Sequence, residues 1–166
     1  MLPFVALLVF ATVELGMVFR SATVAANASR AGAREMASSY PSATPAQQSG
    51  VLSRVTVVVE EALRDRSSTD TPQELRIYLS QANGSPVDTA GACDTRCVTY
   101  TWNAATTSWV YSTGTWPDPV ACGSVMDRVG VSIRLSHGGS VGPWRFTRPV
   151  LERTVMRLEP STQCGA

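Results

Sequence analysis

The stretch LPFVALLVFATVELGMVF, residues 2–19, decides the architecture of this chain. Its only charged side chain is Glu14, and its length is at the lower limit for crossing a hydrocarbon core about 30 Å thick. A carboxylate at the centre of a membrane costs about 2.5–3.5 kcal/mol, so Glu14 requires an explanation. The residues alone allow two: Glu14 contacts a neighbouring subunit, or it lies near the end of the span and reaches the headgroups.

The helix formed by this stretch is expected to continue beyond the apolar run. Residues 20–38 are rich in alanine, contain no proline and have a single glycine, Gly32. This composition favours one continuous helix over about residues 2–38. We therefore divide the chain into a transmembrane stem, residues 1–40, and a head, residues 41–166. One side of the helix carries small residues that a sheet or another helix could approach closely: Val18, Ala22, Ala25, Ala26, Ala28 and Ala33.

The head is expected to begin with a helix and to continue as an antiparallel sheet. Residues 45–66 place valines and leucines at helical spacing, although the run VTVVV also permits a strand. Apolar and polar residues then alternate, which is typical of strands that cover a core. The fold class is therefore α+β, with a long N-terminal helix and a second helix packed with a small antiparallel β-sheet. The expected strands are residues 75–80, a hairpin of 97–103 and 108–114, residues 129–137 and residues 150–160, with a glycine-rich turn at 136–143.

Composition excludes some classes of protein and indicates a source. The 166 residues carry a net charge of +1, which gives no sign of a nucleic-acid-binding surface. The 14 basic residues are all arginine, as expected for a GC-rich, actinobacterial genome.

Four cysteines, all in the head, indicate an oxidising compartment. An even number of cysteines beyond a membrane anchor fits two disulfides. A zinc site needs ligand pairs at CxxC spacing, and CDTRC is one residue too long. We expect disulfides and no metal. The pairing stays open, with a weak preference for a small loop closed by Cys93 and Cys97 and for a bond between Cys122 and Cys164.

No catalytic set of residues is visible in the sequence. The single histidine, His137, lies in the glycine-rich segment and is interpreted as a solvated turn residue. Motifs for metal, phosphate or dinucleotide binding are absent, so we expect no enzyme activity and no cofactor. The tryptophans and tyrosines around the predicted hairpin could form a ligand platform, but cross-strand pairing and core packing are commoner uses of such residues.

The charges around the stem conflict with the cysteines about orientation. A cleavable signal peptide has a basic N-terminal region, which this sequence lacks, so we expect an uncleaved anchor. Arg20, Arg30 and Arg34 follow the apolar run, and the positive-inside rule would keep the head in the cytoplasm. The cysteines favour an extracytoplasmic head. A basic segment upstream of Met1 would remove the conflict.

The stem resembles the TadE-like proteins of Tad (Flp, type IVc) pilus systems. The resemblance rests on an apolar run that ends in ELG, residues 14–16, and on the alanine-rich segment with SRAGAR, residues 29–34. The head segments CVTYTWN, DRVGVSIRLSH and ERTVMRLEP are similar to the actinobacterial branch of this family.

The resemblance implies a pilin-like fold and a non-enzymatic minor pilin or pseudopilin that supports assembly of the pilus. It implies a single-pass protein of the cytoplasmic membrane, with an extracytoplasmic C-terminal head, in the assembly site or in the pilus itself. Glu14 and Gly16 become the expected intersubunit contact within the membrane. The alternative is a membrane-anchored, adhesin-like module that binds through its aromatic-rich head. The implied partners are other Tad pseudopilins, the Flp major pilin, the inner-membrane platform of the secretion system, a prepilin peptidase and membrane lipid, with no nucleic acid.

The N-terminal end of the sequence departs from the family pattern. Family members are cut by a dedicated peptidase at a glycine that precedes the apolar run, with a glutamate shortly after the cut. This sequence begins at Met1 within the apolar run and has no such glycine. We expect either a start codon assigned too late or a member that is not processed.

Overall fold

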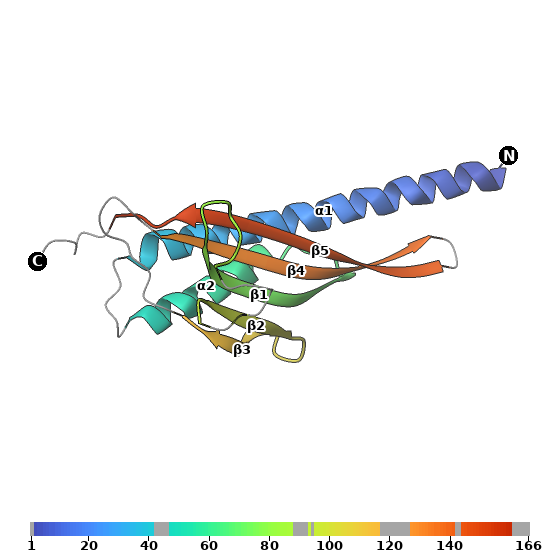
Figure 1. Cartoon of the computed structure of the whole chain (residues 1–166). Helices are drawn as coiled ribbons and strands as arrows, with labels where there is room; N and C mark the ends of the chain where they lie inside the picture. Colours follow the sequence, from blue (N-terminus) through green and yellow to red (C-terminus); the bar gives the residue numbers. More distant parts are fainter. Residues whose placement is uncertain are drawn as a thin grey trace, which may run out of the picture.

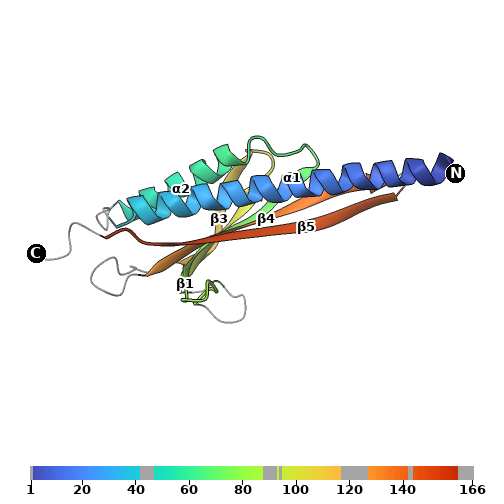
Figure 2. The ribbon, with the colours of Figure 1, turned by 90° about the horizontal axis from the view of Figure 1, so that it is seen from above.

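The computed structural model describes residues 2–41, 47–87, 93, 95–116, 127–141 and 144–160. The strands form one antiparallel sheet in the order β3-β2-β1-β4-β5, and α1 and α2 lie together on one face of it (Figures 1 and 2). The predicted α+β class is confirmed. The elements are α1 (Leu2–Ser39), α2 (Gln48–Ala62), β1 (Asp70–Ser80), β2 (Cys97–Asn103), β3 (Ser108–Thr115), β4 (Arg128–Val141) and β5 (Trp144–Arg157).

The helix α1 is continuous, as predicted, and its two halves have different surroundings. The C-terminal half packs against β4, β5 and α2, and Ala25, Ala28 and Ala33 are fully buried there. The predicted side of small residues is therefore the side that faces the sheet. The first turns of the N-terminal half extend past the end of the sheet (Figure 1), and this helix is long and apolar enough to cross a membrane. Its exposed large apolar side chains are Phe4, Val5, Leu7, Leu8, Val9, Phe10, Val13, Leu15 and Phe19.

The core lies between the two helices and the sheet. The helix α2 presents Val51, Val55 and Val59 to it, each at most 1% exposed and each separated by one helical turn. This spacing explains why the run VTVVV is helical, and the alternative of a strand there was wrong. The strand β4 contributes every second residue: Val129, Val131, Ile133 and Leu135 are fully buried.

The sheet and α1 approach each other closely at Gly32. A Cβ atom on Gly32 would lie 2.7 Å from Val59 Cγ2 and 3.3 Å from Val131 Cγ1. Any side chain at this position would therefore push α1 away from α2 and β4. The glycine of the SRAGAR segment has a packing reason in this fold.

The strands β4 and β5 are longer than predicted. The turn expected at residues 136–143 was wrong for its first six positions, because Gly138, Gly139 and Ser140 pair with Thr147, Phe146 and Arg145 of β5. The pair extends as a narrow ribbon beside α1 toward the N-terminus of that helix (Figures 1 and 2). We call residues 138–141 and 144–148 the hairpin tip.

The disulfide between Cys93 and Cys97 is present at the start of β2, as weakly preferred from the sequence. Gly114 of β3 makes room for it: its φ is +102°, and a Cβ there would lie 2.2 Å from the carbonyl oxygen of Cys97. Cys122 and Cys164 lie outside the described residues, so their bond stays a prediction.

Candidate functional site

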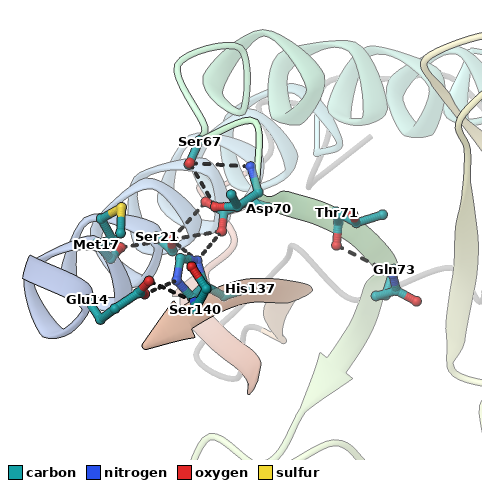
Figure 3. A network of polar contacts seen from close by, with 10 residues as sticks. Glu14, Met17, Ser21, Ser67, Asp70, Thr71, Gln73, His137 and Ser140 are labelled. Carbon is teal, nitrogen blue, oxygen red and sulfur yellow. Dashed lines mark hydrogen bonds and ion pairs between the residues drawn. The ribbon is translucent and has the colours of Figure 1, made fainter. Parts of the chain in front are cut away.

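Four polar side chains are buried together where α1 meets the β1–β4 pair (Figure 3). Glu14, Ser21, Asp70 and His137 are 8%, 1%, 5% and 0% exposed, respectively. Polar groups at such depth are retained when they satisfy one another. We call these four residues the polar cluster.

Three separate elements bring the cluster together. Glu14 and Ser21 lie two helical turns apart on α1, so they face the same side. Asp70 is the first residue of β1, and its backbone N–H donates to Ser67 O at 2.9 Å. His137 is the direct register partner of Asp70 on β4.

The centre of the cluster is a tight contact among Ser21, Asp70 and His137. His137 Nδ1 lies 2.6 Å from Asp70 Oδ1, which identifies Nδ1 as a protonated donor to the carboxylate. Ser21 Oγ lies 2.7 Å from Asp70 Oδ2 and 3.1 Å from His137 Nδ1. These contacts fix the imidazole ring with its other nitrogen, Nε2, toward Glu14.

Glu14 joins this centre to the hairpin tip. The backbone N–H of Ser140 donates to Glu14 Oε1 at 2.8 Å. Glu14 Oε2 lies 3.8 Å from His137 Nε2, and neither atom has a hydrogen-bond partner among the described residues. Glu14 therefore contacts the backbone of β4 through one oxygen and faces the imidazole of His137 with the other.

The cluster contains the residue types of a hydrolase triad without its geometry. In a triad the serine contacts one imidazole nitrogen and the aspartate the other. Here Ser21 and Asp70 both contact Nδ1 of His137, and Ser21 is 1% exposed. The arrangement holds three elements together and offers no reactive hydroxyl to a substrate.

A groove of about 440 Å³ runs beside the cluster, between α1 and the hairpin tip. Met17 and Glu14 line it from α1, and Arg145 and Phe146 line it from β5. Gly139 lets the hairpin tip lie close to Glu14, because a Cβ at this position would lie 2.7 Å from Glu14 Oε2 and 2.4 Å from Phe146 Cζ.

The structure places the residues predicted as a stem contact in different surroundings. Glu14 is 8% exposed and accepts a hydrogen bond from the backbone of Ser140 in the chain's own hairpin. Gly16 is exposed, and nothing lies within 4 Å of where its Cβ would be. The role of either residue between subunits stays a proposal.

The interpretation of His137 as a solvated turn residue was wrong, because it is fully buried within β4. A signal for this was present in the sequence. The alternation that buries Val129 to Leu135 continues to His137 and puts its side chain on the same face. Asp70 and Ser21 were missed, because their relation to His137 depends on the register of β1 with β4 and on the docking of α1.

Four aromatic residues of the head form two cross-strand pairs. Trp102 and Trp109 are register partners with ring centroids 5.1 Å apart, and Tyr100 pairs with Tyr111 at 6.2 Å. Trp109 is 8% exposed, and Tyr100 and Trp102 pack against the core. These contacts favour the structural use of the aromatics.

No group of three metal-ligating side chains occurs within the part of the chain that the structure describes.

Comparison with protein families gives one match: the model of the family TadE-like protein matches residues 1–34. None of the curated proteins and none of the solved structures matches the chain.

Proposed function

We propose, on the premise that residues 1–34 make this chain a TadE-like protein, that it is a minor pilin or pseudopilin supporting assembly of a Tad pilus. Its role is structural rather than enzymatic, and its partners are other Tad pseudopilins, the Flp major pilin and the membrane platform of the secretion system. The family match and the shape of α1 are the support for this proposal.

One structural observation carries it: the two halves of α1 serve different purposes. The C-terminal half completes the core of the head, whereas the N-terminal half exposes large apolar side chains such as Phe4 at 67% and Val13 at 55%. An apolar surface of this extent needs a membrane or other apolar helices around it. A pilus subunit uses both environments in turn, first the membrane and then the fibre.

The disulfide supports the orientation of this proposal. A bond between Cys93 and Cys97 forms and persists in an oxidising environment, which for a membrane-anchored bacterial protein means the outer side of the cytoplasmic membrane. We therefore place the head outside, with α1 as the single anchor.

Glu14 and Gly16 are the proposed contact with a neighbouring subunit. The open surface at Gly16 would let another helix approach closely. In the single chain the Glu14 carboxylate is occupied by Ser140 and faces His137. A neighbour would therefore reach Glu14 only after the hairpin tip moves, and the contact with Ser140 would be exchanged for an intersubunit one.

Photo-cross-linking in cells tests the proposed partners. A photoreactive amino acid is placed at Leu15, which is 55% exposed beside Glu14 and Gly16, and in a control at Val57, which is 62% exposed on α2. We expect Leu15 to capture pilin-like proteins only in cells that express the pilus system, and Val57 to capture them much less. Cross-links from Leu15 to lipid alone would contradict the proposal and favour an isolated, adhesin-like anchor.

A further inference from the structure

The hairpin tip lies beside the apolar half of α1 rather than beside the half that belongs to the core. The hydrogen bond from Ser140 to Glu14 fixes the position of the tip along α1. Glu14 lies within the apolar half, because its neighbours Val13 and Leu15 are apolar and 55% exposed each. Figures 1 and 2 both show the β4–β5 ribbon continuing past the rest of the sheet along this helix.

This position limits how deeply the helix can enter a membrane. A hydrocarbon core does not accommodate strand backbone whose N–H and C=O groups lack partners. The strand β5 is at the edge of the sheet, so its outer side has no strand partner among the described elements. While the hairpin tip stays bound to Glu14, the tip itself must lie in the headgroup layer.

The charge of the hairpin tip fits that layer. The segment 136–149 contains two arginines, Arg145 and Arg148, and no aspartate or glutamate. Both arginines are exposed, whereas the nearby Glu14 is buried in its bond with Ser140. The tip therefore presents positive charge at the end of the apolar helix, where anionic lipid phosphates lie.

The apolar groups between the arginines complete an interfacial surface. The guanidinium of Arg148 lies 5.6 Å from the ring centre of Phe146, and Phe146 lines the groove next to Arg145 and Met17. Aromatic and long basic side chains of this kind keep an apolar body near lipid and a charged end in the headgroups.

We propose that the hairpin tip docks on the headgroups of anionic phospholipids through Arg145 and Arg148, and so sets the depth of the stem. This proposal rests on the membrane anchoring in the proposed function and is independent of the role in the pilus. The hydrogen bond between Ser140 and Glu14 holds the hairpin tip against α1, and it therefore sets the level on the helix at which the headgroups lie.

Hydrogen–deuterium exchange of the full chain in lipid nanodiscs tests the proposal. Exchange at residues 138–148 is compared in discs of phosphatidylcholine and in discs that also contain phosphatidylglycerol, with β2–β3 amides as an internal reference. We expect slower exchange at the tip with phosphatidylglycerol, by about fivefold for each arginine engaged, and loss of this difference at high salt.

The variant with Arg145→Gln and Arg148→Gln should lose the difference between the two lipids. The matched control removes two exposed arginines of α1 instead, Arg30→Gln and Arg34→Gln, about 24 Å or more along the helix from Glu14. Equal exchange at the tip in both lipids, unchanged protection in the first variant, or loss of protection in the control would each overturn the proposal. A chain that does not enter the discs would overturn the anchoring as well, whereas loss or retention of pili in cells does not bear on this measurement.

Discussion

Ser140 donates its backbone N–H to Glu14 Oε1 at 2.8 Å, across a sequence separation of 126 residues. This bond joins the hairpin tip to the apolar half of α1. Behind it, His137 and Asp70 connect the same point to β4 and β1. Glu14 is therefore part of the fold of the head, and its hydrogen bond with Ser140 connects the apolar half of α1 to the sheet.

Removing the imidazole of His137 should strongly destabilise the protein. His137→Ala removes the buried hydrogen bond to the Asp70 carboxylate and leaves an empty space, and losing a hydrogen bond to a charged group typically costs about 1.5–3 kcal/mol. Ser21→Ala, which removes one hydroxyl from the same cluster, should cost about 1 kcal/mol. Thermal unfolding of the full chain in detergent measures both. A His137→Ala variant as stable as the wild type would contradict the role given to the cluster.

Changing Glu14 to glutamine should separate its structural role from its proposed role between subunits. The amide oxygen of Glu14→Gln can still accept from Ser140, so we expect a folded head. The charge is lost, so we expect fewer pili and weaker co-purification with other pilin-like chains. The control is Glu61→Gln. Glu61 is exposed and forms an ion pair with Arg64. Normal pili with Glu14→Gln would exclude the intersubunit role.

Substitution by alanine should have opposite effects on stability at two glycines in helices, Gly32 and Gly50, because only Gly32 is closely packed. Gly32→Ala should destabilise the fold by about 1–3 kcal/mol, because the new methyl group meets Val59 and Val131. Gly50→Ala, in α2 with nothing within 4 Å, should stabilise by about 0.5–1 kcal/mol through the better helix propensity of alanine. Chemical denaturation of the full chain compares them. A stabilising Gly32→Ala would show that α1 lies farther from α2 than described.

Tyr78 should make the fold sensitive to alkaline pH. Its side chain is 1% exposed, and burial raises the pKa of its hydroxyl above the ordinary value near 10, with Arg153 and Arg76 acting against this rise. A pKa raised on folding contributes stability that is present below about pH 10 and is lost as the pH rises through the folded pKa. Tyr78→Phe should therefore weaken the alkaline loss of stability.

A second tyrosine, Tyr100, limits how much of the alkaline loss of stability Tyr78→Phe can remove. Burial also raises the pKa of Tyr100, so Tyr78→Phe should remove only part of the loss. The comparison variant is Tyr111→Phe, because the Tyr111 side chain is 57% exposed and is only the lesser cause of the raised pKa of Tyr100. Melting temperatures of the three proteins between pH 8 and 11 are compared, with pH values chosen about the ordinary tyrosine pKa. An identical alkaline profile for wild type and Tyr78→Phe would refute the assignment.

Local patterns in the sequence were sufficient for most of the elements. The alanine-rich segment after Phe19 predicts the single helix α1, and the alternation in CVTYTWN and SWVYSTG predicts the β2–β3 hairpin that is found. Both signals reflect interactions between residues close in sequence. The β-branched run in α2 was ambiguous, since only burial of Val55 and Val59 against α1 and the sheet decides for a helix.

The polar cluster could be predicted only in part, because its contacts are long-range. Glu14 stood out by its position in an apolar run, but its partner Ser140 lies in a segment whose glycines favour a turn. Those glycines instead allow the strand to pass close to α1, as Gly139 does beside Glu14. The register of β1 with β4, which places Asp70 opposite His137, is not encoded in either segment alone.

The most direct test of the central claim is the number of Tad pili on cells that lack this chain. Surface fibres are counted by electron microscopy in the wild type, in an in-frame deletion, and in the deletion complemented with the full chain. We expect the deletion to lose most or all pili and the complemented strain to regain them. A deletion strain with the wild-type number of pili would contradict the proposed function.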